Sequence, residues 1–61
     1  MNAKQVIRLL EENGWIEVRQ KGSHRIFKHP TITDNIPVAD HGTKDIPIST
    51  LKATLKKAGI K

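Results

Sequence analysis

The chain is 61 residues long and carries 11 Lys and Arg against 6 Asp and Glu, which gives a net charge of +5. This length fits one domain, residues 1–61, and such a domain buries only about 60% of the surface of its unfolded chain. The lack of Cys excludes a disulfide framework and a cysteine zinc site. No segment approaches the roughly 18 apolar residues of a membrane span. The first residues also lack the apolar run of a secretory signal, so we expect a cytoplasmic protein.

The positive charge is concentrated in two segments of the chain. Residues 18–29 contain no acid and four cations: Arg19, Lys21, Arg25 and Lys28. The second segment follows Asp45 and contains Lys52, Lys56, Lys57 and Lys61. Two cationic segments in so small a chain indicate a polyanionic partner, with nucleic acid as the first candidate.

The first expected element is a helix over residues 3–13. Asn2 is followed three residues later by Gln5, which is the pattern of a capping box. Asn13-Gly14 supplies a left-handed stop. Between these signals the apolar residues recur at helical spacing, at Ala3, Val6, Ile7 and Leu10.

Two strands are expected next, over residues 15–19 and 24–28, joined by a turn at residues 20–23. In the first, Ile16 and Val18 alternate with Trp15, Glu17 and Arg19, so the two sets lie on opposite faces. In the second we expect Phe27 to face the core, because its ring is the larger apolar group. His24 and Ile26 then share the open face. Trp15 is expected to pack at the sheet edge and to leave some surface for a partner.

The last expected elements are an outer strand over residues 36–39, where Pro37 suits a sheet edge, and a helix after Pro47. Either Asp45 or Ser49 caps this helix, and Gly59 ends it. Its predicted buried stripe is Ile48, Leu51, Leu55 and Ala58. The order α-β-β-β-α predicts an α+β fold, with a three-stranded antiparallel sheet and both helices covering one face.

His24 is the candidate catalytic residue. It follows Lys21-Gly22-Ser23 at the mouth of the expected hairpin. The ordinary pKa of histidine, about 6.5, allows it to take and to give a proton near neutral pH. In RNA, a base that removes the 2′-hydroxyl proton lets that oxygen attack the adjacent phosphate. The residues expected to hold RNA around this histidine are Arg19, Lys21, Ser23, Arg25 and Lys28, and the Thr50 hydroxyl is a further candidate to orient phosphate.

The motifs, taken in order, resemble the HicA family of toxins from bacterial toxin–antitoxin pairs. They are the opening helix ending in Asn13-Gly14-Trp15, the Lys21–His24 stretch, and Phe27-Lys28-His29-Pro30. The resemblance continues through residues 38–41, 44–47 and 50–60. It covers nearly the whole chain, and no single piece is decisive alone.

The resemblance implies a messenger-RNA interferase with a fold like that of the double-stranded-RNA-binding domain. It implies that His24 is catalytic and that a HicB-type antitoxin holds the toxin inactive by covering the His24 face. The chain departs from the family pattern at Arg25, where many members have a second histidine, at Asp40, where proline is frequent, and at Ser49, where glycine is common. None of these departures touches His24.

One alternative remains open from the residues, a non-catalytic RNA-binding module with the same fold, in which His24 only contacts RNA. A zinc site formed by His24, His29 and His41 is disfavoured, because the spacings of these residues match no familiar ligand pattern. We therefore expect no metal and no cofactor.

Overall fold

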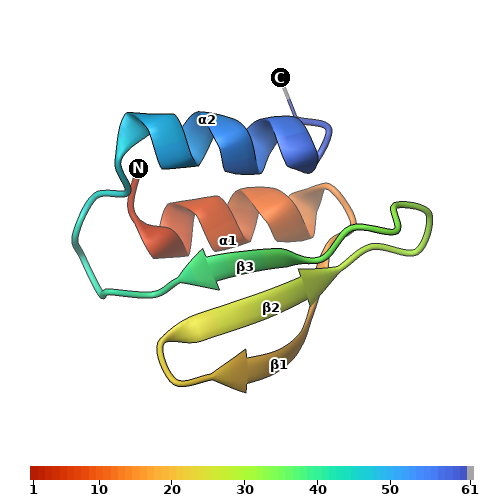
Figure 1. The fold of residues 1–61 in the computed structure, drawn as a ribbon, viewed down its shortest axis with the longest axis horizontal. Helices are drawn as coiled ribbons and strands as arrows, with labels where there is room; N and C mark the ends of the chain where they lie inside the picture. Colours follow the sequence, from red (N-terminus) through yellow and green to blue (C-terminus); the bar gives the residue numbers. More distant parts are fainter. Residues whose placement is uncertain (61) are drawn as a thin grey trace.

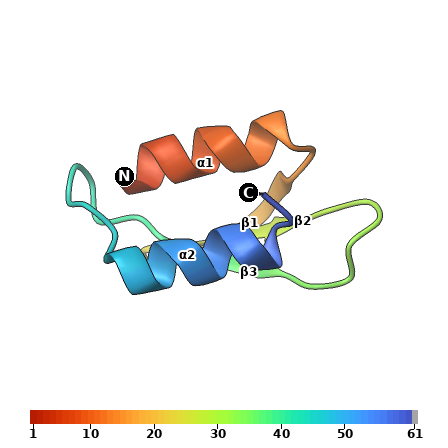
Figure 2. The same ribbon diagram turned by 90° about the horizontal axis from the view of Figure 1, so that it is seen from above.

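The computed structural model describes residues 1–60 as two helices and a three-stranded antiparallel sheet. The elements are α1 (Ala3–Glu12), β1 (Ile16–Lys21), β2 (His24–Lys28), β3 (Ile36–Ala39) and α2 (Ile48–Lys57). β2 lies between β1 and β3. α1 lies across one side of the sheet, and α2 lies along its β3 edge (Figures 1 and 2). The predicted α+β fold and element order are confirmed.

Both ends of α1 follow the signals in the sequence. The Asn2 side chain accepts a hydrogen bond from the Gln5 backbone N–H at 3.0 Å, and the Gln5 side chain accepts one from the Asn2 N–H at 2.9 Å. At the other end Gly14 has a φ of +89°, and the Trp15 N–H donates to the Leu10 carbonyl at 3.0 Å. This is the Schellman geometry that a glycine after the last turn permits.

A single core joins α1 to one face of β2 and β3. Phe27 is fully buried, as predicted, and its cross-strand partner Ile36 is buried with it. The buried residues are Ala3, Val6, Ile7, Leu10, Trp15, Phe27, Ile36, Val38 and Ala58.

Trp15 corrects a prediction. It precedes β1 rather than forming part of it, and it is only 2% exposed. Its indole N–H donates to the Ala58 carbonyl at 3.4 Å, which ties the start of β1 to the end of α2. The turn at Gly14 directs the chain back toward Leu10, so the ring enters the core. Trp15 therefore neither packs at the sheet edge nor offers surface to a partner.

α2 begins without a side-chain cap. Pro47 occupies the cap position, so neither Asp45 nor Ser49 has the predicted capping role. Asp45 instead lies 3.9 Å from the Met1 amino group. Neither helix in the described part of the chain is long and apolar enough to cross a membrane.

The predicted buried stripe of α2 is only partly correct. Ile48 is 69% exposed, Leu51 and Leu55 are half-buried, and Ala58 alone is buried. The physical reason is the position of the helix along the β3 edge (Figure 1). Leu51 packs against the core without being buried in it, and Ala58, just after the end of α2, is the stripe residue that enters the core. The stop at Gly59 is confirmed, with a φ of +75°.

β1 contains a bulge that the alternation of apolar residues did not predict. Glu17 pairs with Phe27, but Arg19 pairs with Ile26, so Val18 is the extra residue. The strand then continues to Lys21, and the predicted four-residue turn shortens to Gly22-Ser23. The φ of +59° at Gly22 suits the first central residue of a type II′ turn.

Candidate functional site

His24 lies on the sheet face opposite Phe27, at the start of β2. It is exposed, and its cross-strand partners are Lys21 on β1 and Ala39 on β3. Because alternate residues of a strand share a face, Ile26 lies on the same face as His24. This agrees with the arrangement predicted from the sequence.

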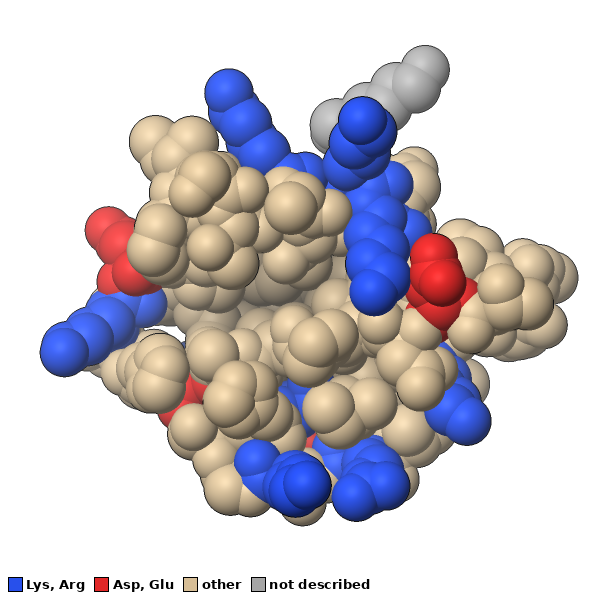
Figure 3. Space-filling view, viewed as in Figure 1, with Lys and Arg blue, Asp and Glu red and all other residues tan. Residues whose placement is uncertain are grey.

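The register brings three of the predicted cations to the His24 face. Arg19 pairs with Ile26, Lys21 pairs with His24, and Lys28 pairs with Ile16 on the same side of the sheet. All three cations are exposed. Figure 3 shows Lys and Arg side chains along the lower margin of the molecule, over the strands, and a second group over α2.

A shallow hollow of about 510 Å³ lies beside His24 on this face. Its floor is apolar, its rim carries cations, and its lining, all from described residues, contains no Asp or Glu. The lining residues are Val18, Arg19, Lys21, Ile26, Lys28, Asn35 and Pro37.

Sequence reasoning missed Val18, Asn35 and Pro37 as part of this site. Pro37 pairs with Ile26, so it belongs to the His24 face, and Asn35 shares its parity two residues earlier. The pairing of β2 with β3 carries this information. The separate patterns of the two strands do not.

Arg25 is the predicted RNA ligand that the structure separates from the others. It alternates with His24 and Ile26, so it lies on the helix-covered side, where its partner is Val38. Its guanidinium is 3.1 Å from an Asp40 carboxylate oxygen and 3.4 Å from Glu17 Oε1. The side chain is 33% exposed, against 18% for Asp40. Two carboxylates therefore already hold this cation.

The two hydroxyl candidates lie in different places. Ser23 is the second residue of the hairpin turn, adjacent to His24, and its carbonyl accepts a hydrogen bond from the Asp40 N–H at 2.7 Å. Its side chain is exposed at the edge of the basic face. Thr50 lies on α2 and lines a separate groove.

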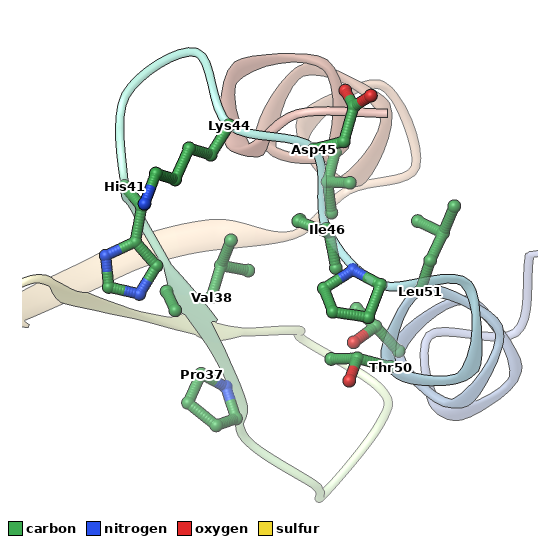
Figure 4. Close-up of a pocket in the computed structure, with 12 residues that line it drawn as sticks. Pro37, Val38, His41, Lys44, Asp45, Ile46, Thr50 and Leu51 are labelled. Carbon is green, nitrogen blue, oxygen red and sulfur yellow. The ribbon is translucent and has the colours of Figure 1, made fainter.

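That groove runs between β3 and α2 and has a volume of about 350 Å³ (Figure 4). Core residues such as Val6 and Val38 reach its floor, and Ile46 and Leu51 line its sides. In Figure 4 the Lys44 side chain extends toward His41 at the loop side of the groove, and Asp45 points away from it. His41 lines this groove and does not line the cationic hollow.

His29 has structural partners. Its Nδ1 accepts a hydrogen bond from the Thr31 N–H at 3.1 Å, so a neutral ring carries its proton on Nε2, which lies 3.1 Å from the Asn13 carbonyl. The ring centroid is 5.1 Å from that of Trp15. His29 thus links the end of α1 to the loop after β2. In residues 1–60 no group of three His, Asp or Glu side chains is arranged to hold a metal ion.

Comparison with known proteins supports the resemblance carried by the motifs. A search of curated proteins finds no match. A family model described as the HicA toxin of bacterial toxin–antitoxin systems matches residues 3–60, which is nearly the whole chain. The match spans both helices, all three strands and the His24 face. The chain therefore belongs to the HicA family of bacterial toxins.

Proposed function

We propose that this toxin is an endoribonuclease that cleaves messenger RNA with His24 and that a HicB-type antitoxin neutralises it. The observation that carries the proposal is the position of His24, which is exposed opposite Lys21, a lining residue of the hollow, on a face that holds three cations. A polyanion approaching this face meets positive charge and a proton-transfer group together.

The reaction needs little machinery. His24 takes the proton of a ribose 2′-hydroxyl, the 2′ oxygen forms a bond to the adjacent phosphorus, and the bond to the 5′ oxygen breaks. The products are a 2′,3′-cyclic phosphate and a 5′-hydroxyl, whose proton comes from the imidazolium or from water. Arg19, Lys21 and Lys28 stabilise the charge that develops on the phosphate oxygens, and the Ser23 hydroxyl orients the phosphate beside them.

Replacement of His24 tests the catalytic assignment. We expect His24→Ala to lower RNA cleavage by at least about 100-fold, the low end for a missing acid–base group. The side chain is exposed, so the melting temperature should stay close to that of the parent. His41→Ala is the matched control, because His41 is also exposed but lies in the loop beyond β3.

Growth of bacteria that express each variant gives a second measurement. The parent and His41→Ala should arrest growth, and His24→Ala should not. If folded His24→Ala arrests growth and cleaves RNA like the parent, the catalytic assignment is wrong. If neither form cleaves but both bind RNA, the chain is the non-catalytic RNA-binding module.

The same face suits a protein inhibitor. Ile16 and Val18 are 58% and 49% exposed, next to the cationic rim. An antitoxin that places apolar and acidic groups here would exclude RNA sterically, and complementary charge would speed its association. Co-expression with the neighbouring reading frame should restore growth and raise the melting temperature of the toxin. A purified pair that cleaves RNA as fast as the toxin alone would contradict the steric model.

A further inference from the structure

The hollow beside His24 combines features that a bare phosphate-binding surface does not need. Three cations form its rim, but its floor is apolar, formed by Val18, Ile26 and Pro37. Its volume of about 510 Å³ falls within the roughly 300–1,000 Å³ of small-molecule sites. The cations of the rim are sufficient to bind phosphates. The apolar floor is complementary to a ligand that also has an apolar face.

Asn35 adds a directional polar group to this floor. Asn35 lies one residue before β3 and two before Pro37, the partner of Ile26, so the alternation of the strand places it on the His24 face. A carboxamide offers two donors and an acceptor in one plane, which is the arrangement that pairs with the edge of a nucleobase. An apolar floor, one carboxamide and a cationic rim together match one ligand chemistry, a nucleotide with its base unstacked.

We propose that this hollow is a base-binding subsite for one nucleotide of single-stranded RNA, with Asn35 as the residue that distinguishes bases. The base lies against Ile26 and Pro37, and Asn35 hydrogen-bonds to its edge. The flanking phosphates lie on Arg19, Lys21 and Lys28. Lys21 is the cross-strand partner of His24. The subsite thus positions the neighbouring ribose at the imidazole. This inference rests on the proposed function and names its substrate as unpaired RNA.

A duplex does not fit this arrangement, because its bases are stacked and paired away from a shallow site. Single-stranded binding proteins likewise combine a cationic track with surfaces that receive the flat faces of bases. Here Trp15 and Phe27, the single Trp and the single Phe of the chain, are buried, so aliphatic side chains and a proline supply that surface.

The test measures binding without cleavage, in the His24→Ala background, by fluorescence anisotropy. The probes are labelled single strands of A, C or U, about eight nucleotides long to fit the site size of a small binding fold, and a duplex of mixed sequence. We expect the single strands to bind more tightly than the duplex and to differ in affinity from one another.

Asn35→Ala should then reduce the affinity for the preferred base about tenfold, which corresponds to about 1.4 kcal/mol, and should bring the affinities for the three bases closer together. Thr33→Ala is the matched control, because Thr33 is exposed on the same connection but does not line the hollow. Ile26→Thr, which keeps the branched shape, should weaken all single strands alike, since it changes the floor.

Three results would overturn the subsite: equal loss for all bases in Asn35→Ala, no loss in that variant, or duplex binding as tight as single-strand binding. Each is separable from failure of the proposed function. If His24→Ala loses cleavage but Asn35→Ala keeps the base preference of the parent, the nuclease proposal stands and the subsite proposal is wrong. If the parent chain binds RNA with a base preference but does not cleave it, the subsite proposal stands and the nuclease proposal is wrong.

Discussion

Arg25→Met separates a structural cation from the cations proposed to bind RNA. The parent side chain lies on the helix-covered side of the sheet, 3.1 Å from Asp40 and 3.4 Å from Glu17. Methionine keeps much of the apolar stem and removes the charge. Its removal leaves two partly buried carboxylates without their shared partner.

The expected loss of stability lies between two measured limits. An exposed ion pair contributes about 0.2–1 kcal/mol, and breaking a fully buried one costs about 3–5 kcal/mol. Because the Arg25 side chain is 33% exposed and that of Asp40 is 18% exposed, we expect a loss of about 2 kcal/mol from the free energy of unfolding. For a domain of this size that corresponds to a melting temperature about 8–16 °C lower.

The assay pairs thermal unfolding, followed by circular dichroism, with the salt dependence of RNA binding in the His24→Ala background. A residue that neutralises one phosphate of a single strand contributes about 0.7 to the slope of log affinity against log salt. Arg25→Met should leave that slope unchanged, measured well below its melting temperature. Arg19→Ala is the control and should reduce the slope by about 0.7 with little loss of stability. A stable Arg25→Met protein with a reduced slope would refute the reasoning and restore Arg25 as an RNA ligand.

Three further predictions concern the remaining residues and the conditions of the reaction. His29→Ala should lower the free energy of unfolding by about 1–2 kcal/mol, because the Thr31 N–H and the Asn13 carbonyl lose their partner. It should nevertheless reduce cleavage less than His24→Ala does. Urea unfolding measures the first effect, and an activity assay at low temperature measures the second. RNA affinity should fall with salt with a slope of roughly −2, as phosphate contacts from Arg19, Lys21 and Lys28 predict. A nearly flat plot would show that the basic face only keeps the protein in solution. Cleavage should persist after dialysis against chelator, and loss of activity that zinc or magnesium restores would contradict a histidine mechanism without metal.

The fold was predictable because most of its signals are local. Each signal acts within a few residues of the chain, as do the capping box at Asn2, the stop at Gly14 and the edge proline at Pro37. The structure confirms the helix and the strand that these signals predict. The size of Phe27 alone predicts that it lies in the core, and the structure confirms this. The burial of Phe27 decides which face of β2 turns toward the helices. These signals fix the order of elements and the face on which His24 lies.

The incorrect predictions share a different cause, because they concern residues whose environment depends on how distant elements pack together. The stripe of α2 has helical period, but the helix lies at the β3 edge, so Ile48 stays exposed. Trp15 has the alternation of a strand residue, but the turn at Gly14 takes it into the core. Arg25 is as basic as its neighbours, and only the register shows that Asp40 and Glu17 hold it. No pattern within one element contains this information.

The bulge at Val18 determines which cations accompany His24. If β1 continued from the Glu17–Phe27 pair without it, Val18 would oppose Ile26 and Arg19 would oppose Arg25 on the helix-covered side, where two like charges would meet. Lys21 would fall in the turn and lose its place opposite His24. The extra residue instead moves Arg19 and Lys21 together to the open face, which is the re-aiming that bulges produce next to functional sites. Val18 itself then becomes part of the apolar floor of the hollow. One additional residue in a six-residue strand therefore separates the charges that stabilise the fold, Glu17 and Arg25, from the charges available to RNA.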